Sequence, residues 1–244
     1  MKILGIIPAR YSSTRFPGKP LVKINDKPMI EHVWNGVMST GLVDRILVAT
    51  EDKRILEAVH NFGGEAVMTS KMHKSGTDRC GEAIQKIDDL DSYDVIINIQ
   101  GDEPKVAAEH IRLVAATFDD PDVQIATLKK KITSLAELNS TNTVKVVCDL
   151  SGNALYFSRQ PIPYLRNIAT EMWLRRQSYF KHIGIYAFRR GVLQQVVQLA
   201  QTRLEKSESL EQLRWLENGY RIAVRETTKE SVAIDIPEDL NKLK

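Results

Sequence analysis

The feature of this chain that most restricts its fold is the alternation of short apolar runs with amphipathic segments in its first half. Apolar runs with the length of buried strands occupy residues 2–8, 45–52, 65–70 and 94–104. Segments with the apolar spacing of helices lie between them, at residues 28–41, 52–64 and 77–87. Strands that alternate with helices form βαβ units, so this pattern predicts a mostly parallel sheet covered by helices.

The pattern changes after about residue 124, where strand-like alternation of polar and apolar residues begins. Residues 143–159 break at a turn-rich centre, 149–153, which predicts an antiparallel hairpin rather than a crossover. The other expected elements are strands at 124–132, 178–189 and 220–226 and helices at 190–201, 208–219 and 237–244. We therefore expect one α/β domain over residues 1–244, with a mixed sheet and an inserted hairpin subdomain.

Composition excludes several classes of function. The 244 residues, 43% of them hydrophobic, suffice for one large domain, and a net charge of +3 gives no polycationic surface for nucleic acid. Cys80 and Cys148 have no CxxC spacing, which argues against a disulfide framework or a zinc site. The N-terminal apolar run is too short for a signal segment, and no stretch reaches about 18 apolar residues. The sequence predicts a cytoplasmic protein with no membrane or nucleic-acid partner.

The first predicted strand runs into a basic stretch, IIPARYSSTRFPGKPL, residues 6–21. Arg10, Arg15 and Lys19 follow the strand, separated by small hydroxyl residues and a glycine. The stretch matches neither GxGxxG nor the P-loop pattern GxxxxGK followed by Ser or Thr. Its backbone amides at residues 11–14 would nevertheless suit phosphate oxygens, with the three cations neutralising a triphosphate. The alternative is a basic loop that only caps the sheet in water.

Two aspartates follow apolar runs at the expected carboxyl ends of strands, where open α/β sheets bind ligands. Asp102 comes after the run 95–99, and Asp235 ends a short run before the predicted closing helix. One or two carboxylates, together with phosphate oxygens, are the ligands that Mg²⁺ takes in nucleotide sites. Each aspartate could instead cap the helix that follows it.

The segment 208–219 has the spacing of a capping box from Ser209 to Gln212 and ends at Gly219. Its leucines form the apolar face, so spacing alone places Glu211 and Gln212 in solvent. The sequence contains no Ser-His-Asp or Cys-His arrangement with the spacing of a covalent catalyst. Covalent catalysis therefore has no candidate nucleophile.

Seven ordered motifs resemble the 3-deoxy-manno-octulosonate cytidylyltransferases, also called CMP-Kdo synthetases, where Kdo is 3-deoxy-manno-octulosonate. They are IIPARYSSTRFPGKPL, SGTDR, INIQGDEP, YFSRQPIPY, HIGIYAFR, LEQLRWLENG and DIPEDL, and the match runs from residue 3 to about residue 240. The resemblance implies a nucleotide-diphospho-sugar transferase-like fold, a three-layer α/β/α arrangement with a mixed, mostly parallel sheet. It also implies a small antiparallel region, at about 124–189, used for homodimerisation.

The resemblance implies a reaction as well. CTP and Kdo would give CMP-Kdo and pyrophosphate with Mg²⁺, which activates the sugar for lipopolysaccharide biosynthesis in Gram-negative bacteria. The implied CTP-binding residues lie in the opening loop and in SGTDR: Ala9, Arg10, Ser13, Arg15, Lys19, Ser75, Gly76 and Arg79. The implied metal ligands are Asp102 and Asp235, and the implied catalytic set adds Arg15 and Lys19 to these two.

The residues implied to contact the sugar come from four motifs: Gln100, Arg159, His182, Tyr186, Glu211 and Gln212. Arg159 is suited to the role because Kdo carries a carboxylate, which a guanidinium binds in bidentate fashion. Under this resemblance Glu211 and Gln212 face inward, in contrast to the expectation from helix spacing.

Two positions depart from the family pattern: Lys105 stands where an apolar residue is usual, and Ile236 stands where a small hydroxyl residue is usual. They leave the details of sugar and metal geometry open. Two other functions also stay open. The first is a cytidylyltransferase for a related acidic sugar, 8-amino-Kdo or a sialic acid. The second is a non-catalytic regulator that binds CTP.

Overall fold

A computed structural model describes residues 1–12 and 16–243 of the chain. The strands are β1 Ile3–Ala9, β2 Lys23–Ile24, β3 Lys27–Pro28, β4 Arg45–Thr50, β5 Ala66–Met68, β6 Val95–Asn98, β7 Ile125–Lys131, β8 Lys145–Cys148, β9 Ala154–Ser158, β10 Phe180–Arg189 and β11 Ile222–Glu226. The α-helices are α1 Met29–Met38, α2 Lys53–Asn61, α3 Gly76–Ile84, α4 Ala108–Ala116, α5 Leu135–Asn139, α6 Trp173–Arg176, α7 Arg190–Val196, α8 Arg203–Glu208 and α9 Gln212–Glu217. Short 3-10 helices are η1 Lys19–Leu21, η2 Leu90–Ser92, η3 Thr117–Asp119, η4 Thr170–Met172 and η5 Pro237–Leu243.

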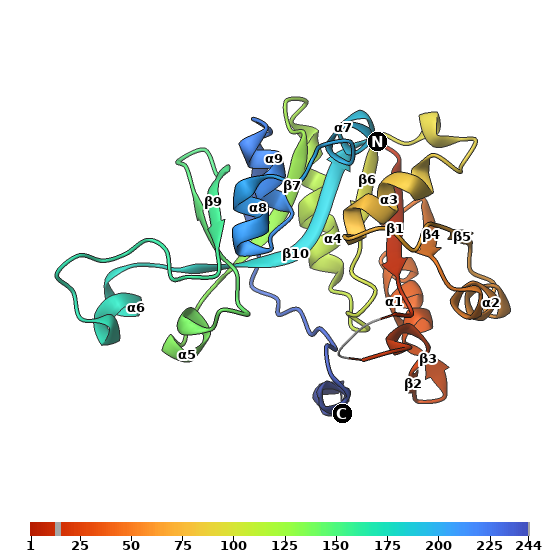
Figure 1. The fold of residues 1–244 in the computed structure, drawn as a ribbon, viewed down its shortest axis with the longest axis horizontal. Coiled ribbons are helices and arrows are strands. Elements are labelled where there is room, and N and C mark those ends of the chain that lie inside the picture. Colours follow the sequence, from red (N-terminus) through yellow and green to blue (C-terminus); the bar gives the residue numbers. More distant parts are fainter. Residues whose placement is uncertain (13–15, 244) are drawn as a thin grey trace.

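The main sheet runs through the centre of the molecule in the order β11-β7-β10-β6-β1-β4-β5 (Figure 1). Strands β6, β1, β4 and β5 are mutually parallel, as the βαβ pattern predicted. Strand β10 is antiparallel to both β6 and β7, and β11 is parallel to β7. The prediction of a mixed, mostly parallel sheet is therefore confirmed, and its parallel part comes from the first half of the chain.

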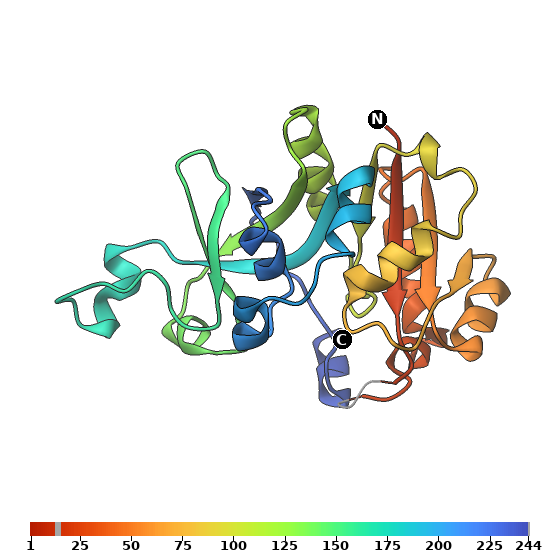
Figure 2. The ribbon, with the colours of Figure 1, turned by 45° about the horizontal axis from the view of Figure 1, so that its top comes forward.

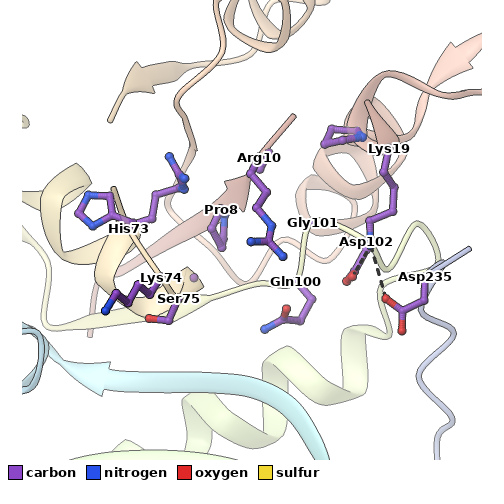
Figure 3. A pocket seen from close by; sticks show the side chains of 14 residues that line it. Pro8, Arg10, Lys19, His73, Lys74, Ser75, Gln100, Gly101, Asp102 and Asp235 are labelled. Atoms are coloured by element: carbon purple, nitrogen blue, oxygen red, sulfur yellow. Dashed lines mark hydrogen bonds and ion pairs between the residues drawn. The ribbon is translucent and has the colours of Figure 1, made fainter. Parts of the chain in front are cut away.

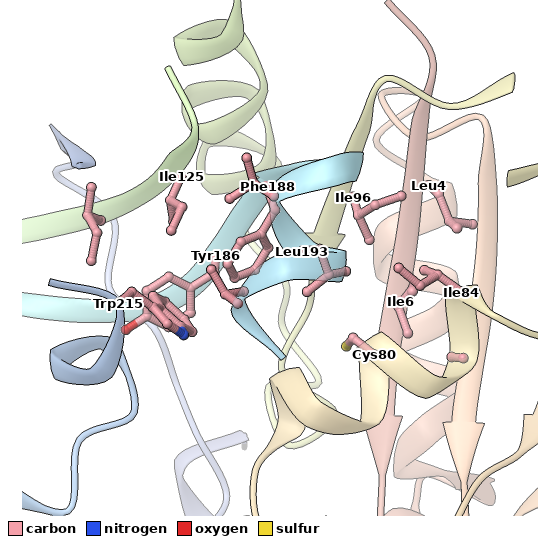
Figure 4. Packing of buried hydrophobic residues seen from close by; sticks show 14 of the residues in the cluster. Leu4, Ile6, Cys80, Ile84, Ile96, Ile125, Tyr186, Phe188, Leu193 and Trp215 are labelled. Atoms are coloured by element: carbon pink, nitrogen blue, oxygen red, sulfur yellow. The ribbon is translucent and has the colours of Figure 1, made fainter. Parts of the chain in front are cut away.

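Helices cover both faces of this sheet. Ile3 and Ile7 of β1 point to the face that α1, α2 and α4 cover, and they belong to one hydrophobic core. Leu4 and Ile6 point to the opposite face, into a second core with side chains of α3, α7 and α9, including Trp215 (Figure 4). Because successive side chains of a strand point to opposite faces, β1 is apolar throughout, and the arrangement has the three expected layers.

The predicted hairpin is confirmed: β8 and β9 pair antiparallel, with Val146 opposite Phe157. Gly152 takes φ +84° in the connecting turn, a conformation that glycine adopts without a steric penalty. In two views, the segment with α6 lies at the opposite end of the molecule from α2 (Figures 1 and 2). There Trp173 and Tyr179 pack in a small separate core. A dimerisation role for the region 124–189 stays a prediction.

The helix predicted over 208–219 is wrong at its start. Ser209 takes φ +51° and ends α8, so the chain turns there and α9 begins only at Gln212. The contact expected of a capping box lies earlier, where the backbone N–H of Thr202 donates to Glu205 at 3.4 Å. The closing helix expected at 237–244 is a 3-10 helix over Pro237–Leu243, which has fewer residues per turn than an α-helix. Among the described residues no helix is long and apolar enough to cross a membrane.

Candidate active site

A polar cavity of about 330 Å³ lies at the carboxyl ends of β1 and β6 (Figure 3). It is lined by residues from the opening loop, the start of α3, the segment after β6 and the C-terminal segment: Pro8, Ala9, Arg10, Lys19, Pro20, His73, Lys74, Ser75, Gly76, Arg79, Gln100, Gly101, Asp102 and Asp235. This is the edge at which the sequence placed its ligand site. The cavity therefore brings together four motifs that are far apart in the chain.

Lys19 lies between the two predicted metal carboxylates. Its Nζ is 2.7 Å from Asp102 Oδ2 and 3.8 Å from Asp235 Oδ1 (Figure 3). Gly18 precedes it with φ +71° and turns the loop into η1, which carries the Lys19 side chain toward β6. Two carboxylates that converge on one ammonium form a cation-binding position at the mouth of the parallel strands.

The alternative role of Asp102 as a helix cap is wrong, since α4 begins six residues later with Ala107 at its N-cap. The segment before Asp235 is not a strand, contrary to prediction. It is held beside β6 by a hydrogen bond from Ile234 N to Asp102 O at 2.9 Å. Asp239 Oδ2 accepts from the backbone N–H of Asp235 at 2.8 Å. These contacts place Asp235 without a β-ladder.

The N-terminus of α3 forms another wall of the cavity. Ser75 is its N-cap and accepts from Asp78 N at 3.1 Å. A Cβ at Gly76 would come within 3.2 Å of Pro8 Cγ, so only glycine lets the helix start approach β1 this closely without displacing that ring. Backbone N–H groups at such a helix start are suited to anionic or carbonyl oxygens.

Arg79 lines the cavity, and its guanidinium is fixed by neighbouring side chains. Its Nη1 donates to Thr69 Oγ1 at 2.5 Å, and its Nη2 lies 3.1 Å from Glu51 Oε2. Burial lowers the pKa of the Arg79 guanidinium, and the Glu51 carboxylate opposes that shift. Glu51 also accepts from Tyr11 N at 2.9 Å. This buried pair joins the opening loop to α3.

A chain of buried polar groups connects β6, α3 and the start of α9. Asn98 Nδ2 donates to Thr77 Oγ1 at 3.2 Å, and that hydroxyl donates to Glu211 Oε1 at 2.8 Å. Burial raises the pKa of the Glu211 carboxyl, and hydrogen bonds from Ser75 and Thr77 oppose the shift. Within residues 1–12 and 16–243, the buried Tyr186 hydroxyl and Asn98 Oδ1 have no hydrogen-bond partner. Both atoms are shielded from solvent, and neither residue is among those that line the cavity.

The other predicted sugar residues surround this chain of groups. Gln100 Nε2 donates to Gly184 O at 2.7 Å, at a bulge in β10. The His182 ring lies 5.2 Å from that of Tyr186, and its Nε2 is 2.9 Å from Thr127 Oγ1. Gln212 is only 3% exposed. Glu211 and Gln212 thus face inward, as the resemblance implied and helix spacing did not.

A second cavity, of about 710 Å³, shares one lining residue, Asp235, with the first. Arg159 lines it together with residues of the turn after α5 and of the α8–α9 junction: Thr141, Asn142, Val144 and Ser209. The guanidinium is held by backbone carbonyls: Nε donates to Glu208 O at 2.7 Å and Nη1 donates to Thr141 O at 2.9 Å. A fixed guanidinium therefore lines a cavity that Asp235 also lines.

Ser13 and Arg15 lie outside the described residues. Sequence reasoning missed His73 and Lys74, which line the cavity, and it singled out the segment 50–52 at this edge without a specific role for Glu51, which holds Arg79. His73 and Lys74 directly precede the SGTDR motif, and Glu51 follows β4 at the ligand-binding edge of the sheet. Their positions beside recognised features were the available signal.

Comparison with known proteins places this chain in a family. Residues 4–226 match the family model described as Cytidylyltransferase. The chain is 52% identical to the 3-deoxy-manno-octulosonate cytidylyltransferase of Parabacteroides distasonis, over 99% of this chain and 96% of that protein. It is 47% identical to the enzyme of that name from Geobacter metallireducens, over 100% of this chain and 96% of that protein.

A solved structure of CMP:2-keto-3-deoxy-manno-octonic acid synthetase in complex with CTP is similar throughout. The TM-score is 0.91 and the sequence identity 43%, with 100% of this chain and 97% of that chain covered. The match is nearly full-length in sequence and in structure, and it includes the edge of the sheet where the cavity lies. The chain therefore belongs to the cytidylyltransferase family, among its 3-deoxy-manno-octulosonate cytidylyltransferases.

Proposed function

We propose that this protein transfers the cytidylyl group of CTP to Kdo, giving CMP-Kdo and pyrophosphate. The observation that carries the proposal is that Asp235 lines two cavities, one also lined by cations and a helix start, the other by Arg159. The first suits a triphosphate and the second suits the carboxylate of an acidic sugar. The names of the similar proteins support the same reaction.

The proposed CTP site is the first cavity. Arg10 and Lys19 would neutralise phosphate oxygens, and main-chain groups at Ser75 and Gly76 would contact the cytidine. Arg79 would support the cytidine pocket through its position in the first turn of α3. Ala9, at the end of β1, would let the nucleotide approach the backbone. Ser13 and Arg15 belong to the same proposed loop.

The proposed metal is Mg²⁺, held by Asp102 and Asp235. The fit rests on the donor set, since two carboxylates converge on the position of Lys19 Nζ. Mg²⁺ typically takes one or two carboxylates and completes its coordination with phosphate oxygens and water. When bound, it would supply neutralisation of the phosphate charge and acidify the attacking hydroxyl.

In the proposed reaction the anomeric hydroxyl oxygen of Kdo forms a bond to the α-phosphorus of CTP, while the bond to the pyrophosphate oxygen breaks in line and the hydroxyl proton is released. Positioning and charge neutralisation carry the catalysis. Arg159 would bind the sugar carboxylate, and Lys19 would stabilise the leaving pyrophosphate. The sugar would be enclosed by Gln100, His182, Tyr186, Glu211 and Gln212. The Tyr186 hydroxyl, which has no hydrogen-bond partner among the described residues, would bond to a sugar oxygen.

The test is pyrophosphate release from CTP and Mg²⁺, without sugar and with Kdo, its 8-amino analogue or sialic acid. We expect release that depends on Kdo. Release with only one of the other sugars would move the assignment to that sugar, and CTP binding without release for any sugar would favour the regulator. Asp102→Asn should remove turnover while thermal unfolding stays unchanged, and a folded, active variant would refute the metal role of Asp102.

We further propose that the enzyme acts in the cytoplasm, in lipopolysaccharide biosynthesis, and as a homodimer. Exposed apolar side chains on the hairpin and the α6 segment support the dimer: Leu155 is 62% and Tyr164 74% exposed. Single exposed apolar residues are common, but two on one projecting region suit contact with a second copy. Sedimentation analysis of the purified protein measures this directly, and a monomer at micromolar concentration would refute it.

A further inference from the structure

Lys145, the first residue of β8, is a fully buried cation. Its Nζ donates to three main-chain carbonyls: Ser140 O at 2.8 Å, Thr143 O at 2.7 Å and Arg159 O at 2.6 Å. An ammonium group has three N–H donors, so these contacts use all of them. In the described part of the chain the partners are carbonyls and not a carboxylate, and burial lowers the pKa of Lys145. A charged group is costly to bury unless it is paired or hydrogen-bonded, so these three contacts are needed to keep the Lys145 ammonium in place.

All three carbonyls belong to segments that position the guanidinium of Arg159. Ser140 and Thr143 enclose the turn that contains Thr141, whose carbonyl accepts from Arg159 Nη1 at 2.9 Å. The third carbonyl is that of Arg159 itself. Lys145 therefore fixes both the backbone from which the Arg159 side chain starts and the turn against which that side chain ends.

The opposite side of the guanidinium is held by the α8–α9 junction. Arg159 Nε donates to Glu208 O at 2.7 Å and Nη2 lies 3.4 Å from Ser209 O. The left-handed conformation of Ser209 bends the chain so that both carbonyls are presented to Arg159. With the bond to Thr141, three of the five guanidinium N–H groups are used, and one remains on each terminal nitrogen. That remaining pair can bind a carboxylate through two parallel hydrogen bonds.

We propose that Lys145 is a positioning residue that sets the affinity for the acidic sugar by holding Arg159 and the turn at residues 140–143, without touching either substrate. This inference rests on the proposed function, in which Arg159 binds the sugar carboxylate. Without the ammonium, each of the three carbonyls loses one donor, Ser140 O retains the bond from Thr143 N at 3.1 Å, and the turn loses its tie to β8. The guanidinium then loses the alignment on which a bidentate contact depends. The CTP cavity has none of these carbonyls in its lining, so CTP binding stays intact.

The test compares steady-state kinetics of Lys145→Met with those of the wild-type protein. We expect the KM for Kdo to rise about tenfold or more, while the KM for CTP stays within roughly twofold. Lys181→Met is the matched control, because Lys181 pairs with Lys145 across β10 and β8 but binds Glu137 and Glu230 instead. The control should lose stability without a selective change in the KM for Kdo.

A double-mutant cycle with Arg159→Ala separates positioning from a general structural role. If Lys145 acts through Arg159, Lys145→Met raises the KM for Kdo by less than about twofold once Arg159 is gone. If the two effects multiply, or if the KM values for Kdo and CTP rise together, the proposal is wrong.

Lys145→Arg keeps a buried cation, so it decides the question if Lys145→Met does not fold. Its planar guanidinium does not reproduce the three-way contact, and we expect the same selective rise in the KM for Kdo. An unchanged KM for Kdo in either folded variant overturns the role of Lys145 alone. A wild-type protein that releases no pyrophosphate with Kdo overturns the proposed function and this inference with it.

Discussion

The enclosed His182 ring predicts a specific loss of stability in mild acid. The ring packs edge-on against Phe157 at 5.1 Å and beside Tyr186 at 5.2 Å. Thr127 Oγ1 donates to Ile185 O at 2.7 Å, so it accepts the proton of His182 Nε2, which fixes the neutral tautomer. Burial lowers the pKa of His182 from 6.5 to about 3.

The direction of the change in stability with pH follows from proton linkage. Because the folded pKa of His182 lies below the unfolded one, the unfolded chain takes up a proton first as the pH falls below 6.5. The stability that the neutral ring provides is present above pH 6.5 and is lost progressively from pH 6.5 down to about pH 3. At pH 5 the loss is about 2 kcal/mol, from 1.5 pH units at about 1.36 kcal/mol each. Since His182 is partly exposed to solvent, screening should reduce this loss of stability to between about 1 and 2 kcal/mol.

The assay is urea unfolding at pH 7.5 and pH 5 for the wild-type protein and His182→Gln. Glutamine keeps an N–H donor for Thr127 but does not titrate, so the variant should lose about 1 to 2 kcal/mol less than the wild type between the two pH values. His60→Gln removes an exposed imidazole of α2 and serves as the control, with the wild-type dependence retained. Equal losses in wild type and His182→Gln would refute the reasoning.

Three further perturbations test other contacts. Thr77→Val removes the hydroxyl donor to Glu211, so urea unfolding should show a cost of about 1–3 kcal/mol, while Thr77→Ser should be close to wild type. Glu51→Gln leaves the buried Arg79 without its counter-charge, which should cost about 3–5 kcal/mol and weaken CTP binding in calorimetry. Lys105→Leu loses only an exposed bond to the last described turn. Its stability should therefore change by less than about 0.5 kcal/mol and its turnover should be unchanged, and a large effect in either would contradict the surface role of Lys105.

The sequence predicts the parallel half of the fold and its ligand-binding edge well, because both depend on local patterns. The run from Ile3 to Ile7 is apolar at successive positions, which is typical of a strand covered on both faces. Lys19 and Asp102 follow such strands, and the topology alone brings them to one edge. These residues could be placed without knowledge of any tertiary contact.

The second half of the fold is harder to predict from the sequence, since the features that determine its structure are not periodic. Nothing in the helical spacing of 208–219 indicates that Ser209 is left-handed, yet this one dihedral angle turns Glu211 and Gln212 inward. In the sequence pattern Lys145 occupies an ordinary polar position of a strand, although the structure buries it fully. Burial of a charged group depends on carbonyls supplied by distant segments, which a local pattern does not contain.

The two halves of the fold meet at the place where the proposed reaction must occur. Hydrogen bonds that join them near the site include those of Thr77 with Glu211, Gln100 with Gly184, and Ile234 with Asp102. Each joins a residue of the first half of the chain to one of the second half or of the C-terminal segment that carries Asp235. A transfer between two substrates requires that their binding sites keep a fixed separation. These hydrogen bonds are directional and partly buried, so they set that separation more precisely than an apolar interface of the same size would.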